Sequence, residues 1–272
     1  MLPNLLIIGA MKCGTTSLHN YLNMHPEIYM YKEKSLDFFI YKKNYNKGLD
    51  WYSSKFKMNN VKIYGESSPN YSKYPFFNGV PERIYNHLPG TKLIYIVRDP
   101  IERLISHYYH NFAVGREKRK FSECFKNLNN NNYIVCSMYF LQINQYLNYF
   151  SYDNILILDS KELLGERNET LNKVFSFLKV DDKFASNEFN KIIHKTKKNK
   201  MDNKLANIFS KKGYKTKMEI ILPEFIYSLF FKKSVIPSSI NENILDEIKH
   251  FIKNDIIEFK KLSDKNHESW YV

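Results

Sequence analysis

A short run of small, hydroxylated and basic residues follows the first apolar segment of the sequence. The apolar segment is LLIIG, residues 5–9, and the run is AMKCGTTS, residues 10–17. Where a strand leads through a glycine-containing turn into a helix, backbone N–H groups and the positive helix end point at one place. Lys12 adds a positive charge there. The hydroxyl donors of the run are Thr15, Thr16 and Ser17. The run predicts a site for a phosphate-like anion, and the alternative is an ordinary turn with a capping threonine.

The elements that would hold this turn alternate between strands and helices along the chain. Short apolar runs rich in β-branched residues predict buried parallel strands at 4–9, 61–65, 92–97 and 154–159. Helical patterns predict helices at 15–24, 81–88, 100–113, 137–150, 168–178 and 241–262. This alternation predicts an α/β fold in which helices flank both faces of a central parallel sheet. We expect a single domain over residues 1–272, with a lysine-rich mobile segment at about 191–217.

The composition restricts the partners and the compartment. The formal net charge is +13 and the pI is about 9.3, which favours anionic partners unless the lysines are merely spread over a solvated surface. No run reaches the roughly 20 apolar residues that a membrane span needs. The three cysteines are Cys13, Cys124 and Cys136, and they form no CxxC pair. They therefore suggest neither a disulfide framework nor a zinc site, and we expect a reducing, cytoplasmic location.

The opening turn resembles two known phosphate-binding loops. Gly9 and Gly14 have the spacing of G-x-x-x-x-G-K-[ST] in P-loop nucleotide enzymes, but Thr15 stands at the lysine position and the lysine is Lys12. A Mg·ATP site also needs an acidic residue after a second strand, for which Asp159 is the candidate. The run K-x-G-T-T-S-L instead resembles the 5'-phosphosulfate loop of sulfotransferases that use 3'-phosphoadenosine-5'-phosphosulfate (PAPS). This resemblance implies a P-loop-like sheet and a donor site made of Lys12, Cys13, Gly14, Thr15, Thr16 and Ser17.

A second segment, KLIYIVRDPIERLISHYYH at residues 92–110, resembles the 3'-phosphate site of the same family. The resemblance places Arg98 and Ser106 on that phosphate, and a guanidinium at a strand end is suited to hold it with two hydrogen bonds. ATP lacks a 3'-phosphate, so this site would distinguish the two donors. The alternative is that Arg98 pairs with Asp99 or another carboxylate. Relatives also place a basic loop over the donor, which here would contain His194, Lys195 and Lys197, unless these residues belong to a solvated lysine run.

Three further segments resemble glycan sulfotransferases, including the N-sulfotransferase domains that act on heparan sulfate. They are MHPEIYMYKEKSLDFF, YNKGLDWYSSKF and YGESSPNYSKYP, at residues 24–39, 45–56 and 64–75. In those enzymes a glutamate stands three residues before the first phenylalanine of the pair, and that position is Ser35 here. The resemblance leaves three candidates for the general base that deprotonates the acceptor, namely Glu33, which we prefer, and as alternatives Asp37 and Glu66.

The resemblance implies an enzyme that moves the sulfuryl group of PAPS by in-line displacement to a hydroxyl or amine of a glycan or small molecule, with no metal required. Lys12 would stabilise the leaving oxygen. His107 and His110 stand three residues apart on one predicted helix, and we interpret them as packing residues rather than metal ligands. Two alternatives stay open: a P-loop kinase using Mg·ATP, and a non-catalytic basic module for anionic polymers, which only the charge supports. We expect no nucleic acid partner.

Overall fold

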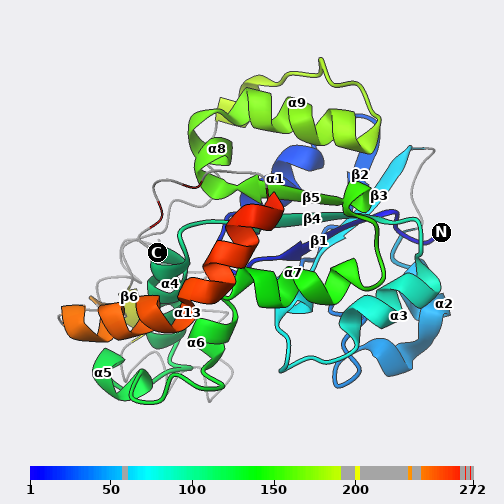
Figure 1. Ribbon diagram of the computed structural model, residues 1–272. Helices are drawn as coiled ribbons and strands as arrows, with labels where there is room; N and C mark the ends of the chain where they lie inside the picture. The colour runs from blue at the N-terminus through cyan, green and yellow to red at the C-terminus, as the bar shows by residue number, and fades with distance from the viewer. Residues whose placement is uncertain are drawn as a thin grey trace.

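The centre of the molecule is a parallel five-stranded sheet (Figure 1). The computed structural model describes residues 1–56, 61–190, 200–202, 232–234, 240–263, 267 and 270. The strands are β1 (Leu5–Gly9), β2 (Ile28–Met30), β3 (Ile63–Ser67), β4 (Lys92–Val97) and β5 (Ile155–Asp159). Their order in the sheet is β2-β3-β1-β4-β5. Strands β2 and β3 thus lie on one side of β1, and β4 and β5 lie on the other. In α/β sheets, ligands bind beyond the carboxyl ends of the strands where the strand order reverses.

Helices cover both faces of this sheet (Figure 1). Helices α1 (Thr15–Leu22), α8 (Ser160–Gly165) and α9 (Arg167–Leu178) lie on one face. Helices α3 (Val80–His87), α7 (Tyr139–Leu147) and α13 (Glu242–Ser263) lie on the other. The remaining described helices are α2 (Gly48–Ser53), α4 (Pro100–Ala113), α5 (Phe121–Cys124) and α6 (Asn132–Val135). The predicted α/β fold with helices on both faces is confirmed.

The sheet is held by the burial of its apolar side chains. All five residues of β1 are buried, and so are Leu93 to Val97 of β4. Each fully buried leucine or isoleucine stabilises the fold by about 1.5–3 kcal/mol relative to an exposed one. With both faces covered, the central strands are apolar without alternation, which is the pattern that made them recognisable in the sequence.

Two short features lie outside the predicted pattern. Strand β2, which is the edge strand next to β3, was not predicted. Lys200–Asp202 form a strand, β6, which pairs antiparallel with β7 (Lys232–Ser234), within and beyond the predicted basic segment. Among the described helices, none is both long enough and apolar enough to span a bilayer.

Candidate functional site

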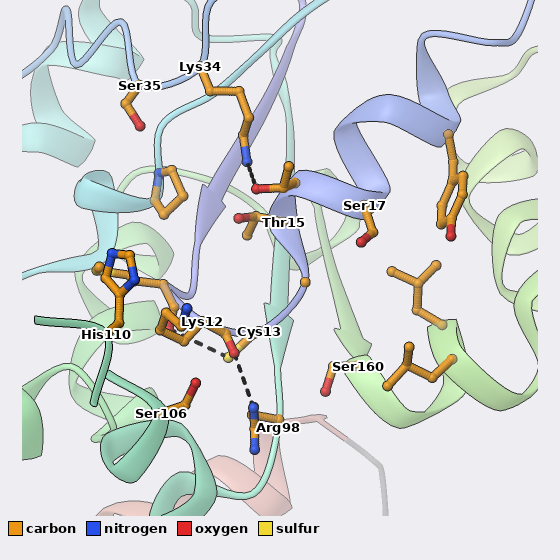
Figure 2. A pocket seen from close by; sticks show the side chains of 17 residues that line it. Lys12, Cys13, Thr15, Ser17, Lys34, Ser35, Arg98, Ser106, His110 and Ser160 are labelled. Atoms are coloured by element: carbon orange, nitrogen blue, oxygen red, sulfur yellow. Dashed lines mark hydrogen bonds between the residues drawn. The ribbon is translucent and has the colours of Figure 1, made fainter. Parts of the chain in front are cut away.

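A cavity of about 490 Å³ lies at the carboxyl ends of the five strands (Figure 2). Every strand of the sheet is followed by residues that line it. After β1 these are Met11, Lys12, Cys13, Gly14, Thr15, Thr16 and Ser17, and after β2 they are Lys34 and Ser35. After β3, β4 and β5 they are Pro69, Arg98, Ser160, Leu163 and Leu164. Helices α1 and α4 add Tyr21, Ser106 and His110. The fold thus brings the two predicted anion sites, far apart in sequence, into one cavity.

The loop after β1 has the backbone shape that the anion site needs. Gly14 caps α1 in the left-handed conformation, with φ of 95°, which a side chain would disfavour. The N–H of Leu18 donates to the Gly14 carbonyl at 3.1 Å, so the helix is closed from its first turn. The amides of that first turn have no carbonyl partner within the helix. They are therefore suited to bind an anion in the cavity, together with the positive end of the helix.

Cys13 lines this loop, but its thiol serves packing. The side chain is buried, and Sγ lies 3.8 Å from the hydroxyl of Tyr139. Burial raises the pKa of Cys13 to about 11, so the thiol stays protonated at neutral pH.

Arg98, after β4, is hydrogen-bonded directly to the loop after β1. Its Nη1 donates to the carbonyl of Lys12 at 3.4 Å, and its Nη2 donates to a carboxylate oxygen of Glu102 at 2.8 Å. Asp99 instead caps α4 by accepting from the N–H of Glu102 at 2.8 Å. Arg98 therefore has a carboxylate partner, as the alternative interpretation held, and still lines the cavity together with Ser106.

Two half-buried lysines line the cavity: Lys12 in the loop after β1, and Lys34 on the loop after β2. Burial and the nearby charge of Arg98 lower the pKa of Lys12. Burial lowers the pKa of Lys34 to about 8, and its Nζ donates to Oγ1 of Thr16 at 2.5 Å. Lys34 was missed by sequence reasoning. The signal that could have revealed it is its place just after β2, whose short strand was not recognised.

The carboxylates named from the sequence do not line the cavity. Glu66 is fully buried on β3 and accepts hydrogen bonds from the hydroxyls of Tyr52, Tyr71 and Ser68 at 2.8, 2.7 and 2.8 Å. Burial raises the pKa of Glu66 to about 7. Asp37 is also buried, and its Oδ2 accepts from Asn70 Nδ2 at 2.8 Å and from Lys43 Nζ. Glu33 is exposed on the loop after β2.

The described wall of the cavity therefore contains no carboxylate, but it does contain an imidazole, that of His110. Burial, Lys12 and Arg116 lower the pKa of His110, so the ring is neutral at pH 7. His110 follows Ser106 by four residues and so shares its helix face. His107 is buried instead, with its ring centroid 4.7 Å from that of Tyr133. His107 therefore packs in the core as interpreted, whereas His110 lines the cavity.

Asp159, the candidate magnesium ligand named from the sequence, is not among the residues that line the described cavity. It caps α8 by accepting from the N–H of Lys161 at 2.8 Å, and it contacts His267 Nδ1 at 3.1 Å. Its carboxylate is thus bound to Lys161 and His267 within the protein. The predicted donor-site residues His194, Lys195 and Lys197 lie outside the described residues.

Comparisons with known proteins agree with this arrangement. The family model described as "Sulfotransferase domain" matches residues 2–254. The human heparan sulfate glucosamine 3-O-sulfotransferase 5 is 31% identical over 195 residues, which cover 68% of this chain and 55% of that protein. The Xenopus laevis bifunctional heparan sulfate N-deacetylase/N-sulfotransferase 1 is 32% identical over 197 residues, covering 65% and 22%. The Dictyostelium discoideum membrane-associated sulfotransferase kil1 is 39% identical over 122 residues, covering 43% and 24%.

The chain thus matches between about a fifth and about a half of the length of these relatives. Among solved structures, a sulfotransferase from Alicyclobacillus acidocaldarius has the same fold, with a TM-score of 0.73 and 20% identity over 100% of both chains. Retinol dehydratase in complex with retinol and PAP has a TM-score of 0.50 and 14% identity, covering 94% of this chain and 82% of that one.

The family match favours the sulfotransferase interpretation over the P-loop kinase alternative, and the capping role of Asp159 agrees with that. One conclusion follows from the match over residues 2–254, from Lys12 in the loop after β1 and from Arg98 after the neighbouring strand β4. The chain belongs to the sulfotransferase domain family.

Proposed function

We propose that this chain transfers the sulfuryl group of PAPS to a hydroxyl or amine of an acceptor and releases adenosine 3',5'-bisphosphate (PAP). The observation that carries this proposal is the single cavity lined by both Lys12 and Arg98, with the Arg98 guanidinium bound to the Lys12 carbonyl. PAPS carries anionic groups on the 3' and 5' sides of one ribose. Two neighbouring cationic sites in one cavity fit such a molecule.

Different residues of the cavity bind different parts of the donor. The amides of the first turn of α1 and the hydroxyls of Thr15 to Ser17 bind the 5'-phosphosulfate, while Arg98 and Ser106 bind the 3'-phosphate. As the acceptor attacks sulfur, the bond from sulfur to the bridging oxygen breaks and negative charge grows on that oxygen. The Lys12 ammonium neutralises it. By analogy with phosphoryl transfer, positioning and charge stabilisation supply most of the rate, and the reaction as proposed uses no metal.

The acceptor also loses a proton, and we assign its removal to His110. The imidazole lines the cavity, lies near Lys12 and has a lowered pKa, so it is ready to accept a proton at neutral pH. Such general-base help is worth about 10²–10⁴-fold in rate. Glu33, Asp37 and Glu66 are weaker candidates, because none of them lines the cavity and two of them are buried with other partners.

We propose a glycan as the acceptor, with a small alcohol or amine as the alternative. Two of the relatives are named for heparan sulfate, and they match this chain over 65–68% of its length. The basic charge of +13 suits an anionic polysaccharide.

The thiols of Cys13, Cys124 and Cys136 are all free, which supports the proposal of a reducing, cytoplasmic location.

The test is calorimetry with PAP and, separately, with Mg·ATP. We expect PAP to bind without magnesium, and Arg98→Ala to weaken that binding. Transfer of labelled sulfate from PAPS to a panel of glycans and small acceptors then identifies the acceptor class. Tight Mg·ATP binding with no detectable PAP binding would contradict the proposed donor.

A further inference from the structure

Lys34 approaches the loop after β1 from the side opposite Arg98. In Figure 2, Lys34 points down toward the first turn of α1, while Arg98 and Ser106 lie at the other end of the cavity. Its Nζ donates to the hydroxyl of Thr16 at 2.5 Å. No part of the proposed mechanism so far uses this ammonium group.

The surroundings of Lys34 leave its charge without compensation. Among the described residues it has no carboxylate partner, and the other charged groups of the cavity wall are Lys12 and Arg98. Arg98 is neutralised in part by Glu102. Lys34 is half-buried, and removing an ammonium group even partly from water with only a hydroxyl partner costs free energy. The same loss of water lowers the pKa of Lys34. A bound anion at this end of the cavity would remove that cost.

The strand order indicates which part of the donor reaches Lys34. In the order β2-β3-β1-β4-β5, Arg98 follows β4 and Lys34 follows β2, so they lie on opposite sides of β1. With the 3'-phosphate at Arg98 and the 5'-phosphate at the first turn of α1, the group beyond the 5'-phosphate extends away from Arg98. That group is the sulfuryl group.

We propose that Lys34 binds the oxygens of the sulfuryl group that is transferred, so that it recognises PAPS but not the product PAP. This inference rests on the proposed function and adds a residue to the reacting end of that site. In the transfer, the bond from sulfur to the bridging oxygen breaks, a bond from sulfur to the acceptor forms, and the acceptor proton goes to His110. Lys34 holds the sulfuryl oxygens throughout and neither gains nor loses a proton.

The experiment compares PAPS and PAP binding, by calorimetry without acceptor, in the wild type and in Lys34→Met. We expect Lys34→Met to bind PAPS about 10- to 100-fold more weakly, the loss typical of one hydrogen bond to a charged group, and to bind PAP with unchanged affinity. Lys34→Gln keeps a donor for Thr16 without the charge, and we expect the same selective loss. Lys32→Met removes an exposed lysine of the same loop and is the matched control, with both affinities unchanged.

Three outcomes would overturn the proposal. Equal weakening of PAPS and PAP would mean that Lys34 only supports the loop after β1. Unchanged binding of both ligands in Lys34→Met and Lys34→Gln would mean that Lys34 does not touch the donor. A wild type that binds neither PAPS nor PAP would contradict the proposed function itself, and so is distinguishable from the first two. Thermal unfolding of each variant shows whether it is folded, and Lys34→Gln serves if Lys34→Met is not.

Discussion

Two charged residues on the strands that flank β1, Arg98 after β4 and Glu66 on β3, are held in opposite ways. On the β4 side, Arg98 projects into the cavity and binds a backbone carbonyl of the loop after β1. On the β3 side, Glu66 is turned into the core and is enclosed by three hydroxyl donors. The cation therefore faces the cavity, and the buried carboxylate holds β3 to its neighbouring segments. The difference shows that the position of an acidic residue in such a motif does not by itself predict that its side chain reaches the cavity.

The largest expected effect is the loss of turnover in Lys12→Ala. The ammonium stabilises charge that appears on the leaving oxygen during transfer, so kcat should fall by about 10²–10³-fold. PAP affinity should fall much less, because the helix amides and Arg98 remain. Steady-state kinetics with labelled PAPS, combined with calorimetry, measures both quantities. A loss of affinity as large as the loss of kcat would mean that Lys12 only binds the donor.

The next effect is expected from His110→Gln. Because the pKa of His110 is lowered, its neutral form predominates from below pH 6.5 upward, and wild-type kcat should rise with pH through that pKa and then level off. His110→Gln should lower kcat by about 10²-fold at pH 7 and remove this rise. If kcat of His110→Gln still rises with pH as in the wild type, His110 is not the general base. A carboxylate is then the better candidate, and Glu33→Gln is the variant to test next.

A smaller effect, on stability rather than turnover, is expected on the other side of β1. Burial raises the pKa of Glu66 from 4.5 to about 7, so the folded state binds this proton more tightly than the unfolded state does. The stability from this group is fully present below pH 4.5 and is lost as pH rises through 7, by on the order of 3 kcal/mol. Glu66→Gln should lack this loss, which denaturant unfolding at pH 4.5 and pH 8 measures as the difference from the wild type.

The same variant also sharpens the assignment of roles. Glu66→Gln should lower kcat by much less than the roughly 10²-fold loss expected when a general base is removed. A larger fall in kcat in the folded variant would mean that Glu66 takes part in the reaction despite its burial.

The sequence was most informative where a local pattern was long. The predicted strand at 92–97 and helix at 100–113 coincide with β4 and α4, because an unbroken apolar run and a proline after a capping aspartate are local signals. Strand β2 has only three residues and was missed, and Lys34 was missed with it. The burial of Glu66 depends on hydroxyls of Tyr52 and Tyr71 that only the folded chain brings to it. The place of His110 in the cavity wall was predictable in part, since it lies four residues after Ser106 on one helix.

The central claim is that one nucleotide occupies both anion sites, and the most direct measurement compares PAP with adenosine 5'-monophosphate, which lacks the 3'-phosphate. In the wild type, calorimetry should show a preference for PAP of about 10- to 100-fold, the size of one charge-assisted contact to phosphate. Arg98→Ala should abolish this preference, while Lys12→Ala should retain it. A preference that is unchanged in Arg98→Ala would contradict the account, because the 3'-phosphate would then be bound elsewhere.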